Sequence, residues 1–224
     1  MRLSIIIPAL DEAAGIGASL EALQFLRAAG CEVILADGGS ADATRAIAAP
    51  LCDQVIAAPR GRATQMNAGA RAAHGDALLF LHADTFLPQD ALAAIIGALD
   101  GGGRRWGRFD VRLAGRHALL RTIASMINLR SRLTGIATGD QALFMTRAVY
   151  AQVGGFPAIP LMEDVAICKR LKALSRPACL RLKVTTSARR WESRGVVRTM
   201  VLMWRLRFEY FLGVAPEDLA RRYR

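Results

Sequence analysis

The sequence predicts an α/β protein in which helices flank a doubly wound, mostly parallel sheet. Short apolar runs of strand type alternate with amphipathic helical patterns through the first hundred residues, and several of the runs end in an acidic side chain. Such alternation is typical of parallel sheets, because each crossover between parallel strands needs a helix. At 224 residues and 53% hydrophobic, the chain can bury a sizeable core, and we expect one domain spanning 1–224.

The first half supplies the clearest elements. Residues 3–7 and 78–81 are continuous apolar runs, as expected for strands buried on both faces, and 33–36 and 55–57 are shorter runs of the same kind. Apolar residues at three- and four-residue spacing predict the intervening helices. These helices cover 14–29, 42–49, 62–74 and 88–99.

The second half is more helical and less regular. We expect strands at 105–113 and 141–146, after the glycine run at 101–103. The expected helices are 117–132, 163–174, 195–212 and 216–222. We therefore divide the chain into a nucleotide-binding half, 1–100, and an acceptor-side half, 101–224, that completes the same sheet.

The net charge of +11 is unevenly distributed. Residues 1–100 hold 6 basic and 11 acidic side chains, whereas 101–224 hold 24 basic and 8 acidic. The arginines are scattered among apolar residues and no zinc or RNA-recognition motif occurs, which argues against a nucleic-acid partner. A nucleotide diphosphate or an anionic membrane surface would account for the charge.

The cysteines and the hydropathy indicate an intracellular protein. The spacing of Cys31, Cys52, Cys168 and Cys179 fits neither a zinc site nor a redox pair, so we expect reduced core residues. We expect no signal peptide and no membrane-spanning helix. The expected location is cytoplasmic, with peripheral contact at the inner face of the membrane as an alternative.

Acidic residues follow several predicted strands. Glu12, Asp37 and Asp84 come after the first, second and fourth strands, and Glu163 and Asp164 follow a later glycine-rich loop. The carboxyl ends of parallel strands meet at one sheet edge, where ligands bind. Each carboxylate alone could serve as a helix cap or a turn residue, but their convergence favours a site.

Six segments, taken in order, resemble family 2 glycosyltransferases with the GT-A fold. They are SIIIPALDE, LADGGSADAT, RGRATQMNAGARAAHGD, LFLHADT, GGFPAIPLMED and RRW. The closest resemblance is to a short, single-domain bacterial subgroup associated with arsenosugar biosynthesis. It implies an enzyme of the hexosyltransferase type that moves a sugar, with inversion, from a nucleotide-diphosphate donor to a small acceptor.

The resemblance also implies roles for individual residues on the donor side. Pro8, Glu12 and Asp37 would frame the base and ribose, and Arg60 and Asn67 would lie along the nucleotide, with Gly69 beside them. Asp84 would be the metal-binding carboxylate of the family's D-x-D motif. The implied cofactor is Mg²⁺ or Mn²⁺, which binds carboxylate and phosphate oxygens and offsets the charge of the leaving group.

The same resemblance implies roles for residues on the acceptor side. Glu163 and Asp164 would be the catalytic pair, and Asp164 matches the base that takes the acceptor's proton. A helix cap is the alternative for this residue. Asp140 and Trp191 are further candidates on the acceptor side.

Two departures from the family pattern stand out. His82 replaces the first carboxylate of D-x-D, either as a hydrogen-bonding contact to the nucleotide or as a metal ligand. Processive members carry Q-x-x-R-W, whereas this chain has Ser187 in place of the glutamine. We expect Arg189 and Arg190 to hold a diphosphate or an anionic acceptor, since arginine forks match phosphate oxygens.

The segment 196–214 places apolar residues on one helical face. They are Val197, Val201, Trp204, Phe208 and Phe211. We expect this face to dock on the protein's own core or in a homodimer, with a membrane surface as the alternative.

Two other functions are compatible with the sequence. One is sugar transfer to a polyprenyl phosphate at the membrane, as in relatives of dolichol-phosphate mannose synthase, which lipid-dependent activity would favour. The other is a non-catalytic nucleotide- or nucleic-acid-binding protein, which predicts no turnover and strongly salt-dependent binding to DNA or RNA.

Overall fold

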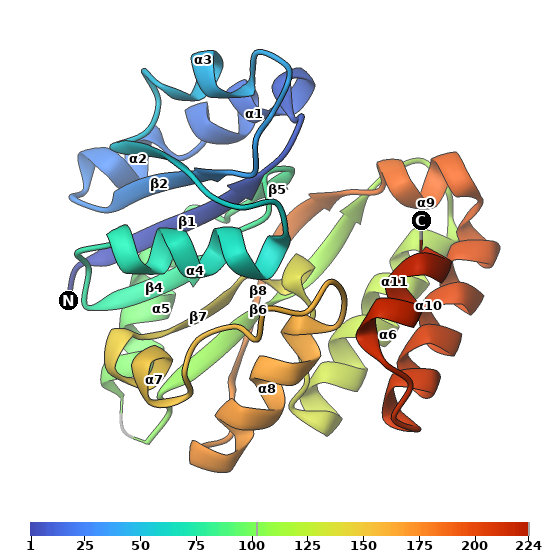
Figure 1. Ribbon diagram of the computed structural model, residues 1–224. Coiled ribbons are helices and arrows are strands. Elements are labelled where there is room, and N and C mark those ends of the chain that lie inside the picture. Colours follow the sequence, from blue (N-terminus) through green and yellow to red (C-terminus); the bar gives the residue numbers. More distant parts are fainter. Residues whose placement is uncertain (102, 224) are drawn as a thin grey trace.

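The computed structural model describes residues 1–101 and 103–223. Within these ranges one sheet contains strands from both halves of the chain, in the order β3-β2-β1-β4-β7-β6-β8-β5 (Figure 1). The strands are β1 (Leu3–Ala9), β2 (Glu32–Asp37), β3 (Gln54–Ala57), β4 (Ala77–Phe80), β5 (Thr85–Phe86), β6 (Trp106–Ala114), β7 (Leu143–Thr146) and β8 (Ala178–Ser187). The predicted α/β class is confirmed.

The helices follow the predicted positions in most cases. They are α1 (Ala13–Glu21), α2 (Gln24–Ala28), α3 (Thr44–Ala48), α4 (Arg62–Ala72), α5 (Ala91–Asp100), α6 (Leu119–Thr134), α7 (Arg147–Gln152), α8 (Glu163–Leu174), α9 (Arg189–Arg194), α10 (Val196–Phe211) and α11 (Pro216–Tyr223), with a 3₁₀ turn η1 (Gly139–Gln141). The single helix expected over 14–29 is instead two, α1 and α2. β5, β8, α7 and α9 lie outside the elements that the sequence predicted.

The strands of the amino-terminal half, β1 to β4, are all parallel. β1 pairs in parallel with β2 and β4, and β2 with β3. Beyond β4 the sheet is mixed, because β7 is antiparallel to both β4 and β6, while β6 and β8 are parallel. β5 adds a short antiparallel pairing to β8.

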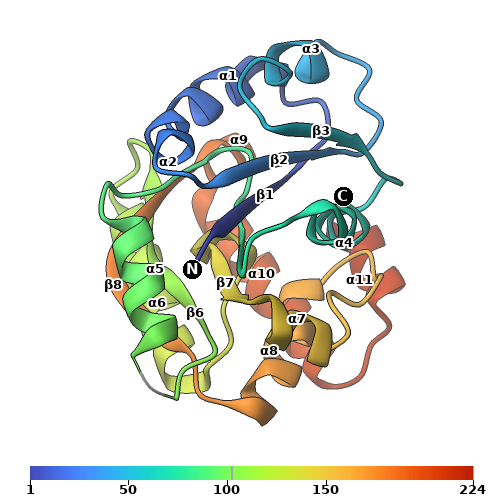
Figure 2. The same ribbon diagram turned by 90° about the vertical axis from the view of Figure 1, so that its left-hand side faces the viewer.

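Alternate residues of β1 enter two separate cores. Ile5 and Ile7 pack with α1 and α2, whereas Ile6 packs with α4 on the opposite face. Figure 2 shows α1, α2 and α3 on one side of β1, β2 and β3, and α4 on the other. This two-sided burial explains why these strands have continuous apolar sequences. Gly69 permits the close approach of α4, because a Cβ there would lie 2.4 Å from Ile6 Cγ2.

The buried carboxylate of Glu32 lies at the start of β2, at the opposite end of this strand from Asp37. Glu32 is only 3% exposed and accepts hydrogen bonds from Ser4 Oγ, Gln54 Nε2 and the backbone N–H of His74, and its Oε1 lies 2.8 Å from His74 Nδ1. Burial alone would raise the pKa of Glu32, but the hydrogen bonds of His74 and Ser4 outweigh it and lower the pKa from 4.5 to about 2. The ionised carboxylate therefore stabilises the fold.

This cluster predicts a pH-dependent contribution to stability. Because the folded pKa lies below the unfolded one, the contribution is complete above pH 4.5 and is lost as the pH falls toward about 2. We expect Glu32→Gln to lower the free energy of unfolding at pH 7 by roughly 2 to 3 kcal/mol. Denaturant titration of both proteins at several pH values should show this difference shrinking below pH 4.5. A difference independent of pH would contradict the charge-based explanation.

The apolar face of α10 does not dock on the core of this chain. Val197, Val201, Trp204, Phe208 and Phe211 are each at least 52% exposed. This corrects the expectation of intramolecular docking, because α10 instead buries Val196, Thr199 and Leu206. Across the part of the chain that the structure describes, no helix is long and apolar enough to cross a membrane.

Candidate active site

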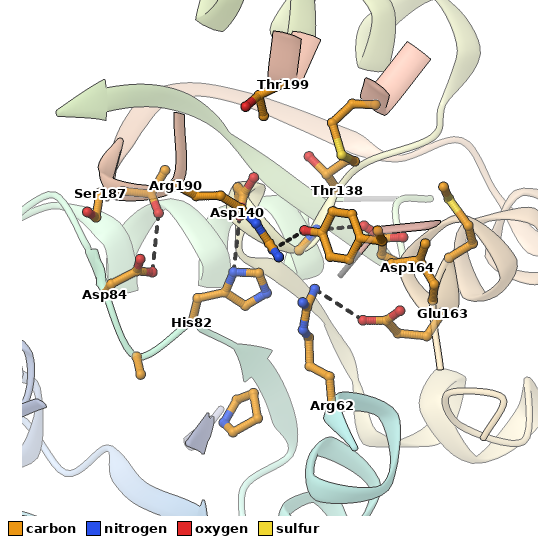
Figure 3. A pocket seen from close by; sticks show the side chains of 18 of the residues that line it. Arg62, His82, Asp84, Thr138, Asp140, Glu163, Asp164, Ser187, Arg190 and Thr199 are labelled. Carbon is orange, nitrogen blue, oxygen red and sulfur yellow. Dashed lines mark hydrogen bonds and ion pairs between the residues drawn. The ribbon is translucent and has the colours of Figure 1, made fainter. Parts of the chain in front are cut away.

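A large cavity lies at the carboxyl ends of β1, β4 and β8. Its volume is about 1370 Å³, and its wall combines the end of β1 at Pro8, the segment after β4, the start of α4, η1, the start of α8 and the side of α10. This is the edge where ligands bind in open α/β sheets. Figure 3 shows Asp84 on one side of it and Glu163 with Asp164 on the other, with His82 and Asp140 between them.

Asp84 is presented to the cavity by the sharp change of direction after β4. Its Oδ1 accepts a hydrogen bond of 3.4 Å from Thr186 Oγ1, and the next residue, Thr85, begins β5 against β8. The carboxylate is partly exposed and lines the cavity. It is therefore available to a ligand rather than committed to the core.

The residues fit a divalent cation that arrives with a phosphate ligand. Among residues 1–101 and 103–223, no three His, Cys, Asp or Glu side chains gather as a metal-binding cluster. Mg²⁺ in proteins is commonly held by one or two carboxylates together with substrate phosphates and water. Asp84 can supply one such carboxylate, so the donor set suits an ion shared with a diphosphate better than a pre-formed site.

His82 is oriented by Asp140. The His82 Nδ1 lies 3.1 Å from Asp140 Oδ1. Its Nε2 is buried without a hydrogen-bonding partner in the described chain and packs against Gly139, where a Cβ would come within 2.3 Å. The ring is therefore held against η1 and contacts Asp140 through one nitrogen.

The charges around Asp140 favour its ionised form. Burial acts to raise the pKa of the Asp140 carboxyl, but the hydrogen bond from His82 and the positive charges of Arg62 and Arg207 lower it below the ordinary value. Asp140 thus faces the cavity as a carboxylate.

The packing of Gly139 against His82 predicts that one methyl group added at position 139 would disturb the site. We expect Gly139→Ala to displace the ring from Asp140 and to lower the free energy of unfolding by about 1 to 3 kcal/mol, the usual cost of overpacking. The melting temperature and the affinity for a nucleoside diphosphate measure the two effects. Gly97→Ala on α5, where the new Cβ meets nothing within 4 Å beyond the nearby backbone of its own helix, is the matched control. Equal behaviour of the two variants would refute this packing argument.

Two adjacent acidic residues open α8, and they differ in environment. Glu163 is 3% exposed and its Oε1 lies 3.3 Å from Arg62 Nη1. Burial, reinforced by the charge of Asp164, raises the pKa of Glu163 despite the opposing Arg62 guanidinium. Glu163 therefore holds Arg62 in the wall of the cavity.

Asp164 is partly exposed and lines the cavity. Its Oδ2 accepts a hydrogen bond of 3.0 Å from the backbone N–H of Gly139, and its Oδ1 accepts one of 2.7 Å from that of Val165. These bonds fix the carboxylate and tie α8 to η1. They leave it with lone pairs to accept a further proton or hydrogen bond.

α9 brings the predicted Arg189, Arg190 and Trp191 to the cavity wall. Arg189 Nη2 lies 3.2 Å from Glu12 Oε2. Arg190 donates a hydrogen bond to the Tyr223 hydroxyl, and its guanidinium carbon lies 3.9 Å from the centre of the Tyr223 ring. Both arginines thus have partners within the chain.

Most of the predicted site residues line this one cavity. They are Pro8, Glu12, Arg60, His82, Asp84, Asp140, Glu163, Asp164, Arg189, Arg190 and Trp191. Three lie outside its wall, and one of these is Gly69, which packs against Ile6. Asp37 is 1% exposed and accepts hydrogen bonds from Gly39 and Ser40, which shapes the turn after β2. Asn67 bonds to the backbone of Phe156 and to the Tyr150 hydroxyl.

Sequence reasoning missed several residues of the cavity wall. Arg62, Arg130, Thr199 and Arg207 all line it. Arg62 lies within the segment RGRATQMNAGARAAHGD, but no role was assigned to it. Arg130 and Arg207 had no motif around them, and only their placement within largely apolar helical segments could have singled them out.

Solved structures share this fold. TarS 1-349 from S. aureus superposes with a TM-score of 0.68 at 19% identity, covering 84% of this chain and 61% of that one. A mannosyltransferase from Pyrobaculum calidifontis, solved with GDP-Man and Mn²⁺, superposes with a TM-score of 0.68 at 21% identity, covering 99% and 64%. The chain thus spans less than two thirds of the length of these two structures. The fold is that of the GT-A glycosyltransferases.

A third neighbour is glucosyl-3-phosphoglycerate synthase from Mycobacterium tuberculosis, solved with Mn²⁺, UDP and glucosyl-3-phosphoglycerate. It superposes with a TM-score of 0.62 at 19% identity, covering 83% of this chain and 70% of that one. A search of curated proteins found no match. The family described as "Glycosyl transferase family 2" matches residues 4–150. The chain therefore belongs to glycosyl transferase family 2, as its motifs predicted.

Proposed function

We propose that this chain is a metal-assisted, inverting glycosyltransferase that moves a sugar from a nucleotide-diphosphate donor to a small acceptor. The observation that carries the proposal is the placement of Asp84 and Asp164 on opposite sides of one cavity of about 1370 Å³ (Figure 3). Support comes from the family and from fold neighbours solved with UDP-GlcNAc, with GDP-Man and Mn²⁺, and with UDP and Mn²⁺.

The donor binds along residues 1–100 in this proposal. Pro8, Glu12 and Arg60 contact the nucleoside from the cavity wall, and the diphosphate lies near Asp84. Asp37 and Asn67 act less directly, through the turn after β2 and the segment at Phe156. A divalent ion held by Asp84 would neutralise negative charge on the diphosphate oxygens.

The acceptor binds along residues 101–224. Its hydroxyl oxygen attacks the anomeric carbon as Asp164 takes the hydroxyl proton, and a new glycosidic bond forms. The bond from the anomeric carbon to the phosphate oxygen breaks, and the nucleoside diphosphate leaves with the electron pair. Attack from the face opposite the leaving group inverts the configuration. Glu163 positions Arg62, while Asp140 and Trp191 line the acceptor's approach.

The experiment is a donor screen with stereochemical readout. The protein is incubated with UDP- and GDP-sugars and Mn²⁺ or Mg²⁺, and release of the nucleoside diphosphate is followed. Water serves as the acceptor in this assay, and rapid NMR of the released sugar, before it mutarotates, gives its anomeric configuration. We expect release from one class of donor and an inverted product. Retention of configuration would contradict the role given to Asp164.

A second candidate is transfer to a polyprenyl phosphate at a membrane surface. It is favoured by the exposed apolar face of α10, which also carries Arg198 and Arg205. A homodimer through the same face is the competing explanation. Stimulation of turnover by anionic vesicles, with the protein monomeric in solution, would favour the membrane. The arsenosugar-associated subgroup, a bacterial source and a cytoplasmic location stay predictions.

A further inference from the structure

Among the described residues, neither Arg130 nor Arg207 in the cavity wall has a carboxylate partner. Arg130 lies on α6 and Arg207 on α10, and both line the cavity. Arg130 Nε and Nη2 and Arg207 Nε are buried and have no hydrogen-bonding partner within residues 1–101 and 103–223. Arg62 in the same wall is instead paired with Glu163. Arg130 and Arg207 therefore present unpartnered donors to the cavity.

A further hydroxyl donor lies on α10, eight residues before Arg207. Thr199 lines the cavity, and its Oγ1 is likewise buried without a hydrogen-bonding partner in the described chain. Buried donors are normally satisfied, and a cation left without an anion is especially costly. The pair Arg130 and Arg207 is thus incomplete without a ligand that accepts hydrogen bonds.

The electrostatics point in the same direction. Burial lowers the pKa of Arg130 to about 10, and the positive charge of Arg207 adds to this lowering. The two guanidinium groups therefore repel each other across the cavity wall. A bound anion would turn this repulsion into two attractive contacts.

The pair lies near the carboxylate that we propose as the base. The charge of Asp164 acts on Arg130, and the charge of Arg207 acts on Asp140. Asp84 lies across the cavity from Asp164 (Figure 3). An anion bound by the arginine pair would therefore lie on the acceptor side.

Apolar side chains surround the same region. Ile123 and Met126 of α6 and Met200 and Met203 of α10 line the cavity beside the arginines. Met126 is 42% exposed, so the apolar lining continues to the cavity mouth. A ligand bound there would combine an anionic group with an apolar portion.

We infer that Arg130 and Arg207 bind a phosphate group of the acceptor, so that the acceptor is a phosphate ester with an apolar portion. The statement that this phosphate belongs to the acceptor rests on the proposed glycosyltransferase function. The anion site itself does not depend on that function. Two guanidinium groups match a doubly charged phosphate better than a singly charged carboxylate.

Calorimetric titration with inorganic phosphate, in the absence of donor, tests the site. We expect Arg130→Gln and Arg207→Gln each to weaken phosphate binding by about tenfold or more, because a charged hydrogen bond is lost. Arg205→Gln is the matched control, since Arg205 lies on α10 outside the cavity wall and pairs with Glu209. Phosphate affinity unaffected by either cavity variant would overturn the inference.

Melting temperatures show whether the variants are folded. Removing one of two repelling, buried cations should preserve or raise the melting temperature without phosphate. Added phosphate should raise the melting temperature of the wild-type protein more than that of the cavity variants. An equal phosphate-induced shift in all of them would count against the site.

Two further binding experiments, called arms below, distinguish a soluble phosphate ester from a lipid-linked one. One uses glycerol 3-phosphate in solution, and the other uses phosphatidylcholine vesicles with and without a long-chain alkyl phosphate. Binding in the second arm that both cavity variants weaken supports a lipid-linked phosphate ester, whereas binding in the first arm alone would overturn the apolar portion of the inference and leave a site for a small soluble phosphate ester. Binding in neither arm would overturn the inference.

A parallel titration with UDP or GDP and Mn²⁺ separates this inference from the proposed function. We expect the cavity variants to keep the nucleotide affinity of the wild-type protein. If they lose it by the same factor as phosphate affinity, the arginines serve the donor and the inference is wrong. If the wild-type protein binds phosphate but no nucleotide, the proposed function fails and the anion site remains.

Discussion

Replacing Asp164 by Asn should leave donor binding intact and lower the rate of sugar transfer by a factor of about 10² or more. An amide cannot take the acceptor's proton, and general-base catalysis typically contributes a factor of this size. Donor affinity should survive because Asp164 lies across the cavity from Asp84 (Figure 3). Single-turnover transfer, donor affinity and melting temperature should be measured on one preparation.

The structural role of Asp164 provides the control for this variant. Its carboxylate accepts hydrogen bonds from the backbone of Gly139 and Val165, and the Asn side chain can keep one of them. A large drop in melting temperature together with lost donor binding would assign Asp164 to helix capping. Near-normal transfer would exclude Asp164 as the base.

Replacing Asp84 by Asn should abolish the effect of Mn²⁺ on donor affinity and weaken metal-dependent binding by at least about tenfold, the scale expected when a charged contact is lost. The fold should persist, since the carboxylate is partly exposed and its hydrogen bond to Thr186 is long, at 3.4 Å. Calorimetry with UDP or GDP, with and without Mn²⁺, measures the change.

Asp90→Asn is the matched control for Asp84→Asn. Asp90 is exposed, precedes α5 and lies outside the cavity wall. We expect it to bind nucleotide and metal like the wild-type protein. If Asp84→Asn behaves in the same way, Asp84 is not the metal ligand.

The sequence was most informative where each residue has one dominant constraint. β1 and β4 are buried on both faces, so their continuous apolar runs predict buried strands. Because the apolar run also showed where β4 ends, Asp84 could be placed at the carboxyl edge of the sheet, where ligands bind. The pairing of β4 with β7 could not be predicted, because the antiparallel partner comes from a segment more than sixty residues away.

Weaker patterns hid other elements. β8 alternates polar and apolar residues with little full burial, and β5 has only two residues, so neither produces a strong pattern. The break between α1 and α2 is also invisible, because Leu20, Leu23 and Leu26 are all buried and follow one helical periodicity.

Parts of the site depend on contacts between distant segments. The sequence identified Glu163 and Asp164 together, but only the fold shows that Glu163 is paired with Arg62 while Asp164 faces the cavity. The proximity of Arg130 and Arg207 likewise requires α6 and α10 to lie side by side. Such pairings have no local signature in the sequence.

The most direct test of the proposed activity is a thermal-shift titration of the wild-type protein with UDP and GDP, each with and without Mn²⁺. Ligands that bind only the folded state raise its melting temperature. The account predicts a clear rise for one nucleoside diphosphate that is much larger with Mn²⁺ than without it. No rise with either nucleotide, in the presence or absence of Mn²⁺, would contradict it.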